Sequence, residues 1–119
     1  MSTQAAVGIA IIGCGFVADL YLETLRKHAQ LELHGVFDRD SGRSFAFARR
    51  HAVEVYPDLA SLLADPRVEL VLNLTNPHAH YEVSRACLEA GKHVYCEKPL
   101  AMRVDDARAL VALAEARGL

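Results

Sequence analysis

The sequence has no tryptophan, only three cysteines and no long run of apolar residues. No segment approaches the roughly 20 apolar residues of a membrane-spanning helix, so we expect no membrane partner. The N-terminus lacks both the cationic start and the small-residue cleavage pattern of a signal peptide. The cysteines form no C-x-x-C pair and their number is odd, which favours reduced thiols in a cytoplasmic protein over a disulfide framework.

An excess of charge of one sign is also missing. The chain carries 13 basic and 15 acidic residues, a formal net charge of -2. The basic residues are scattered, and the densest run, 49–51, is typical of a solvated helix end. We therefore expect no nucleic-acid partner, because binding one requires a basic patch or stripe. The nucleophile elbow G-x-S-x-G and the P-loop pattern are absent as well.

The chain does contain a regular alternation of apolar runs and amphipathic stretches. With 119 residues it is long enough for one domain with a real core. Periodicity and turn signals predict strands at 7–12, 31–37, 54–56, 68–74 and 93–96, and helices at 16–29, 41–51, 59–63, 77–90 and 104–117. Ser41, Asp58 and Asn76 are the predicted helix caps. Strands without polar alternation are covered on both faces, so the sequence predicts an α/β fold with a doubly wound parallel sheet, the Rossmann fold.

Ligands of such a sheet bind beyond the carboxyl ends of the strands. The first strand is followed there by Gly13-Cys14-Gly15-Phe16-Val17-Ala18, a G-x-G-x-x-A pattern. Gly13 allows a tight turn, Gly15 has no Cβ to block a pyrophosphate, and Ala18 lets the helix pack on the strand. Asp38 ends the second strand, where its carboxylate can accept from both ribose hydroxyls of an adenosine. The alternative is that the glycines only make a turn and Asp38 only caps the next loop.

Asp38 and its neighbour Arg39 bear on the choice between NAD and NADP. A 2′-phosphate would meet the negative charge of Asp38, which favours NAD. The Arg39 guanidinium can stack on adenine or turn toward a phosphate, so NADP stays possible.

The later loops carry a resemblance to a known family. The segments N-L-T-N-P-H-A-H at 73–80, G-K-H-V at 91–94 and E-K-P-L-A at 97–101 follow the G-x-G-x-x-A loop in order. Together they closely resemble the glucose–fructose oxidoreductase/inositol dehydrogenase (Gfo/Idh/MocA) family, from residue 7 to the last helix. The resemblance implies an NAD(P)-dependent oxidoreductase acting on CH–OH groups of a sugar, inositol or related alcohol.

The resemblance also implies roles for individual residues. Lys98 is the expected catalytic residue, because a cation against a developing alkoxide stabilises the transition state. Glu97 is expected to hold the nicotinamide ribose or Lys98. The other positions that resemble family residues lining the dinucleotide are Thr75, Asn76, Pro77 and His80. Plainer explanations stay open: Asn76 caps a helix, His80 is a surface histidine, and Glu97 with Lys98 is a surface ion pair.

Three smaller expectations concern metal, thiol and backbone. His78 and His80 point to different sides of a helix start, so we expect no metal site. Cys14 lies at a helix N-terminus, where a thiol can be reactive, although it can equally be a neutral filler of the loop. The Lys98–Pro99 peptide bond is predicted to be cis, partly from the sharp turn and partly from the resemblance.

Members of the resembled family continue into a second α/β domain that supplies the substrate pocket, the usual acid/base group and the oligomer interface. The sequence is therefore interpreted as the cofactor domain alone, 1–119, which is inactive in isolation and oligomeric only with that second domain. Two alternatives are a catalytically silent NAD(P)-sensing regulator and a stand-alone cofactor-binding subunit. An intact Lys98 argues against the sensor, which does not need it.

Overall fold

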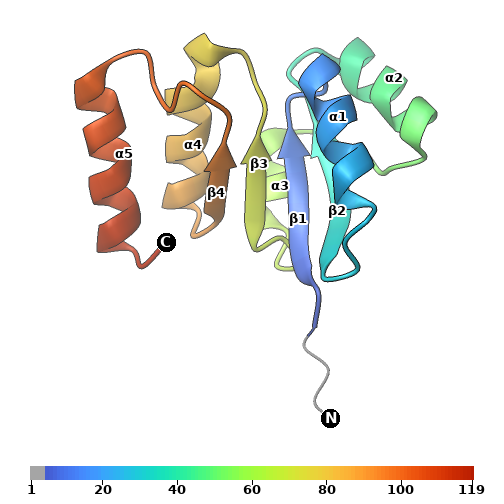
Figure 1. Ribbon diagram of the computed structural model, residues 1–119, viewed down its shortest axis with the longest axis horizontal. Coiled ribbons are helices and arrows are strands. Elements are labelled where there is room, and N and C mark those ends of the chain that lie inside the picture. The colour runs from blue at the N-terminus through green and yellow to red at the C-terminus, as the bar shows by residue number, and fades with distance from the viewer. Residues whose placement is uncertain (1–4) are drawn as a thin grey trace.

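Four of the predicted apolar runs form one parallel sheet (Figure 1). The computed structural model describes residues 5–119, and its sheet has the strand order β2-β1-β3-β4. The strands are β1 (Val7–Ile12), β2 (Leu31–Phe37), β3 (Leu70–Asn73) and β4 (His93–Cys96). The chain therefore moves outward from β1 to β2 and then crosses to the other side of β1. This reversal between β1 and β3 is where an open α/β sheet leaves a crevice for a ligand.

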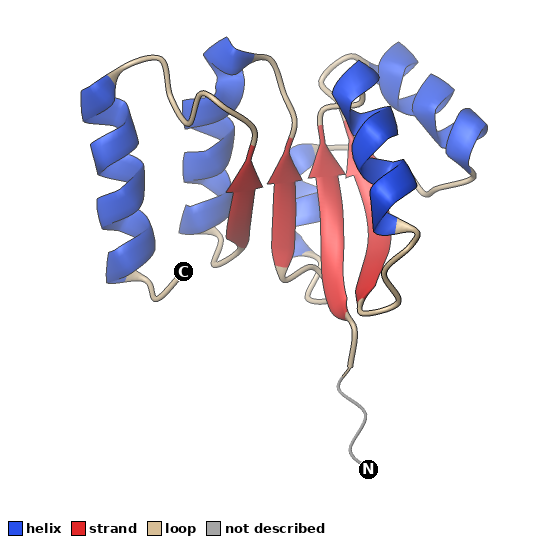
Figure 2. Cartoon of the chain, viewed as in Figure 1, coloured by secondary structure: helices blue, strands red, loops and turns tan. Residues whose placement is uncertain are grey.

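Helices connect the strands and cover both faces of the sheet (Figure 2). They are α1 (Phe16–Leu25), α2 (Ser41–His51), α3 (Leu59–Ala64), α4 (His80–Glu89) and α5 (Val104–Ala116). A 3₁₀ turn, η1 (Pro77–Ala79), leads directly into α4. The predicted doubly wound parallel sheet is confirmed. Within the described range no helix has the length and apolar character to cross a bilayer.

The hydrophobic core consists of two layers, one on each face of the sheet. Side chains alternate along β1, so Ile9 and Ile11 pack against α1 and α2, where Phe47 is fully buried. Ala10 and Ile12 face the opposite layer, where Leu62 of α3 and Cys87 of α4 are fully buried. Because strands buried on both faces have no solvent side, their sequences read as continuous apolar runs.

The structure corrects several element boundaries, among them the helix predicted at 77–90, which begins as the 3₁₀ turn Pro77–Ala79 and becomes α-helical at His80. The first helix ends at Leu25, because the amides of Lys27 and His28 bond three residues back in successive turns. The predicted strand at 54–56 is reduced to one parallel bridge, between Val55 and Val36. The strand predicted at 68–74 pairs regularly only over Leu70–Asn73.

Helix caps were predicted correctly at two of three positions. The Asp58 carboxylate accepts from the amide of Ser61 at 2.7 Å. Asn76 accepts from the amide of His78 at 2.9 Å. Ser41 is instead the first residue of α2, and Asp40 is its cap, accepting from Gly42 and Arg43. A carboxylate suits this position because the helix N-terminus is electropositive.

Candidate functional site: a dinucleotide cleft at the strand ends

The carboxyl ends of β1, β2 and β3 border a cavity of about 590 Å³, a volume within the usual range for small-molecule sites. Eight of the residues predicted to bind cofactor line it: Gly13, Gly15, Phe16, Val17, Asp38, Arg39, Thr75 and Asn76. Parallel strands end at the same edge, so loops far apart in sequence converge here. The cavity also lies at the reversal in strand order.

Glycine occupies positions 13 and 15 of the first loop for different structural reasons. Gly13 has φ +100°, and a Cβ there would lie 2.5 Å from the Leu74 carbonyl oxygen. Its turn therefore requires glycine. Gly15 has φ -88°, and a Cβ would meet no described atom within 4 Å apart from its neighbours in the chain. No contact inside the protein explains glycine at 15, whereas a ligand lying in the cavity against the backbone would.

The first turn of α1 presents backbone amides to the same cavity. Gly15 is the cap residue and has no side chain to bond these amides. An uncapped helix N-terminus is a ready site for an anion such as a pyrophosphate. Ala18 is fully buried between α1 and the sheet and therefore packs under the loop, not in the cavity. The G-x-G-x-x-A loop thus fits a dinucleotide diphosphate.

Asp38 joins the first loop to the second. Its Oδ2 accepts from the amide of Cys14 at 2.8 Å, and its Oδ1 accepts from the amide of Asp40 at 2.8 Å. Each carboxylate oxygen keeps a further acceptor site for a ribose hydroxyl. Asp38 therefore does cap its own loop, as the plainer explanation held, and it also lines the cavity.

Eight lining residues were not among those predicted to bind cofactor. Three of them, Ile12, Phe37 and Leu74, end or directly follow the strands, and the other five are Arg43, Leu59, Ala79, Glu82 and Val83. These five lie on α2, α3, the turn η1 and α4, which border the cavity only after the chain has folded. Arg43 lies in the first turn of α2, whereas Arg39 precedes the cap of that helix, so no local spacing pairs the two residues. The cavity therefore has two guanidinium groups near Asp38 where the sequence indicated one.

The third loop is organised by Asn73, which the sequence reasoning treated only as part of a motif. Asn73 is fully buried at the end of β3. Its side-chain oxygen accepts from the Thr75 hydroxyl at 2.6 Å, and its nitrogen donates to the His80 carbonyl oxygen and to Ser84 Oγ. These bonds fix Thr75 at the cavity. Pro77 begins η1 and is not among the lining residues.

His80 is not a surface histidine, because its side chain is 1% exposed. It also does not line the cavity. Its ring lies between two backbone carbonyls, with Nδ1 2.6 Å from the Pro99 oxygen and Nε2 2.9 Å from the Thr75 oxygen. His80 thus joins the loop after β3 to the loop after β4.

The loop after β4 contains Glu97, exposed Lys98 and a cis peptide bond between Lys98 and Pro99, as predicted. Glu97 Oε1 accepts a 2.6 Å hydrogen bond from the hydroxyl of Tyr21 on α1. This bond to the carboxylate, together with burial, raises the pKa of Tyr21. Tyr21, rather than Lys98, is thus the group bonded to the Glu97 carboxylate in the described structure. Neither Glu97 nor Lys98 lines the cavity itself.

Cys14 lies between the two glycines but is 4% exposed. Burial, and next the Asp38 charge, raise the pKa of its thiol to about 12. The thiolate is the reactive form, so Cys14 is a neutral filler of the loop. Across residues 5–119 no group of three or more His, Cys, Asp or Glu side chains is placed to hold a metal ion.

The fold and this cleft define a dinucleotide-binding α/β domain. Residues 7–119 match the family described as "Oxidoreductase family, NAD-binding Rossmann fold" (GFO_IDH_MocA). The chain belongs to this Gfo/Idh/MocA family and is its NAD-binding domain, as the resemblance implied.

Named relatives agree with this assignment. An inositol 2-dehydrogenase/D-chiro-inositol 3-dehydrogenase of Lactiplantibacillus plantarum is 36% identical over 86% of this chain and 30% of its own length. The structure of GenD2 from gentamicin A biosynthesis in complex with NAD has a TM-score of 0.91, with 31% identity over 100% of this chain and 34% of that one. Biliverdin reductase of Synechocystis with biliverdin and NADP+ has a TM-score of 0.87, with 30% identity over 94% and 35%. The chain spans about a third of the length of the curated relatives it matches.

Proposed function

We propose that this chain is the cofactor domain of an oxidoreductase that moves a hydride between NAD(H) and a CH–OH carbon of a sugar, inositol or related alcohol. The observation that carries the proposal is the open space at Gly15, where no contact within the protein requires glycine. The names of the inositol dehydrogenase relatives support the substrate class.

Different residues of the cleft would bind different parts of the dinucleotide. The amides at the start of α1 would hold the diphosphate, and Asp38 would accept from the adenosine ribose. Thr75 and Asn76 would line the path toward the nicotinamide. When bound, the cofactor supplies the hydride acceptor or donor. The match of these residues to the cavity supports a dinucleotide over a smaller ligand.

Lys98 is the proposed catalytic residue. It lies at the carboxyl end of β4, next to the strand whose loop lines the cavity. Its ammonium group would orient the substrate hydroxyl and favour negative charge on that oxygen as the hydride leaves. Hydride transfer also needs a proton acceptor within hydrogen-bond reach.

We further propose that substrate choice, any oligomer contacts and the partner acid/base group depend on protein outside this sequence, which the short coverage of the relatives supports. We also propose that the protein works in the cytoplasm, which its free cysteines support. The 119-residue chain alone should bind cofactor without turnover. Steady NADH production from a polyol by this chain would contradict that expectation.

Asp38 should make the chain prefer NADH over NADPH, because its carboxylate would face the 2′-phosphate. Calorimetric titration of both cofactors tests this, and we expect NADH to bind at least about tenfold more tightly, a difference of about 1.4 kcal/mol. Asp38→Asn should reduce the NADH/NADPH affinity ratio. The control is Asp105→Asn, which changes an exposed carboxylate on α5 and should leave this ratio unchanged. Tighter NADPH binding by the wild type would show that Arg39 and Arg43 set the preference.

A further inference from the structure

The two residues that flank Lys98 are each held by a side chain from a different helix. On one side, the Tyr21 hydroxyl donates to the Glu97 carboxylate at 2.6 Å. On the other side, His80 Nδ1 lies 2.6 Å from the Pro99 carbonyl oxygen. Lys98 itself is exposed, so its direction depends on how its neighbours are fixed.

Both anchors are firm for different reasons. A hydroxyl bonded to a carboxylate is a short, charge-assisted hydrogen bond, and the Tyr21 ring also meets Tyr95 edge-on at 6.1 Å. His80 is 1% exposed, and its two ring nitrogens face carbonyl oxygens, which only accept. A doubly protonated ring donates to both, and a neutral ring donates to one.

The helices that carry these anchors also border the cofactor cleft. Tyr21 is on α1, whose first turn follows Gly15, and His80 begins α4, which continues the turn after Asn76. Asn73 strengthens the second link, since its side chain bonds the His80 carbonyl oxygen at 3.1 Å and the Thr75 hydroxyl. The position of Lys98 is therefore built on the elements that line the cleft.

We propose that Tyr21 and His80 are positioning residues that together aim Lys98 at the nicotinamide half of the bound dinucleotide. The inference rests on the proposed function, and it adds two residues that do not line the cavity. Tyr21 would act through Glu97, and His80 would act through Pro99 and through the carbonyl oxygen of Thr75. Their loss should weaken contacts to the nicotinamide half and leave the adenosine diphosphate half unchanged.

The test compares the affinities of NADH and ADP for the 119-residue chain by calorimetry, because ADP lacks the nicotinamide and its ribose. Lys98→Met sets the reference, and we expect it to lower the NADH/ADP affinity ratio about tenfold. Tyr21→Phe and His80→Asn should each lower this ratio about three- to tenfold at unchanged ADP affinity. His80→Asn keeps one donor, so its loss should be smaller than that of His80→Ala.

Tyr81→Phe is the matched control, because it removes a hydroxyl from α4 that contacts only exposed Arg85 among the described polar contacts. Thermal unfolding checks that each variant is folded. If His80→Ala does not fold, Tyr21→Phe and His80→Asn still test the inference. Equal weakening of NADH and ADP in Tyr21→Phe and His80→Asn would overturn the inference, because both residues would then be merely structural. An unchanged ratio in Lys98→Met would also overturn it while the proposed function stands. Failure of the wild type to bind NADH at all would instead refute the proposed function.

Discussion

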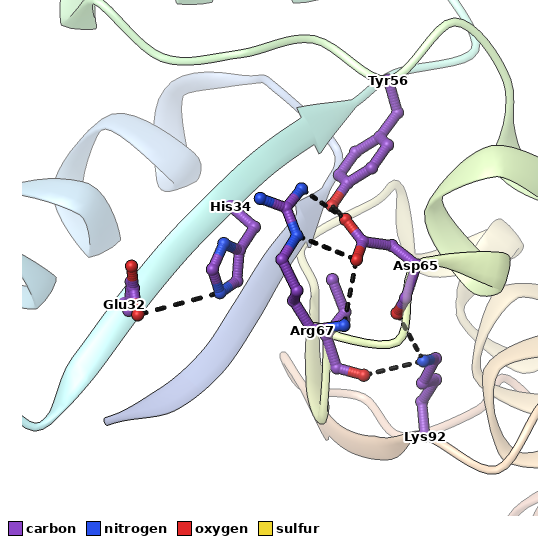
Figure 3. Close-up of polar contacts among 7 residues, drawn as sticks. Glu32, His34, Tyr56, Asp65, Arg67 and Lys92 are labelled. Carbon is purple, nitrogen blue, oxygen red and sulfur yellow. Dashed lines mark hydrogen bonds and ion pairs between the residues drawn. The ribbon is translucent and has the colours of Figure 1, made fainter. Parts of the chain in front are cut away.

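A polar cluster below β3 and β4 and the cleft at the carboxyl ends of β1, β2 and β3 use their polar groups in opposite ways. Asp65, Arg67 and Lys92 lie at the amino ends of β3 and β4, and the hydroxyl of Tyr56 reaches Asp65 from a segment beside β2; we call these four residues the Asp65 cluster (Figure 3). At the carboxyl ends, the amides of the first loop and the side chains of Asp38 and Arg39 face a cavity. Saturated groups contribute to stability, whereas groups with bonding capacity left toward a cavity can bind a ligand.

The Asp65 cluster shows this saturation in detail. The Asp65 carboxylate accepts from the Tyr56 hydroxyl at 2.7 Å and from Arg67 at 2.7 and 3.0 Å. Lys92 is 8% exposed, and its Nζ donates to the backbone oxygens of Asp65 and Val68 at 2.9 and 2.7 Å. Hydrogen bonds from Arg67 and Tyr56 hold the pKa of Asp65 well below its usual range. Burial, and then the bond to Asp65, raise the pKa of Tyr56 to about 12. The cluster has little capacity left for a ligand.

The first glycine loop contains the largest expected contrast within a single turn. Gly13→Ala should destabilise the protein by about 3 kcal/mol, because the left-handed conformation and the Leu74 carbonyl oxygen both oppose a Cβ. Gly15→Ala should change the free energy of unfolding by less than about 1 kcal/mol, since its Cβ would enter open space. Urea denaturation measures both variants.

NADH titration of the same pair completes the contrast. Gly15→Ala should bind NADH at least tenfold more weakly while staying folded. Wild-type affinity in Gly15→Ala would mean that the diphosphate does not approach this part of the loop. Any loss of NADH affinity in Gly13→Ala would then come from its loss of stability alone.

At the opposite end of the sheet, Lys92→Met should cost about 2 kcal/mol of stability, because it removes a charged donor from two buried carbonyl oxygens while keeping the chain length. NADH affinity should not change. Lys27→Met, an exposed lysine just beyond α1, is the matched control and should shift stability by less than about 0.5 kcal/mol. Weaker NADH binding by folded Lys92→Met would contradict the conclusion that the Asp65 cluster contributes to stability and not to cofactor binding.

Acidification should reveal the smallest of these effects. The folded-state pKa of Asp65 is lowered, so its contribution to stability is complete above the unfolded value of about 3.9 and is lost as the pH falls through the folded pKa. The stability advantage of the wild type over Asp65→Asn should therefore shrink as the pH is lowered below about 4. Tyr56→Phe removes one hydrogen bond to this carboxylate. The pH dependence of its urea midpoint should therefore lie between those of the wild type and Asp65→Asn. A pH-independent gap would show that Asp65 contributes through shape and not through its charge.

The sequence by itself determined the order of the four sheet strands and the five helices, the first loop and the place of Asp38. Those predictions rest on local causes: apolar periodicity, the backbone freedom of Gly13, the missing side chain at Gly15 and the caps Asp58 and Asn76. They needed no knowledge of which residues meet across the fold. The strand edge at which Asp38 and Thr75 converge also follows, because parallel strands end together.

Only the tertiary structure decided how the later loops are held. Tyr21 meets Glu97 across 76 residues of sequence, and His80 meets Pro99 across 19. Arg43 joins the cleft because α2 folds beside it, and Lys92 is buried because the turn before β3 covers it. No local pattern encodes such pairs, since each depends on the packing of two elements whose side chains come within hydrogen-bond distance only after the sheet has assembled.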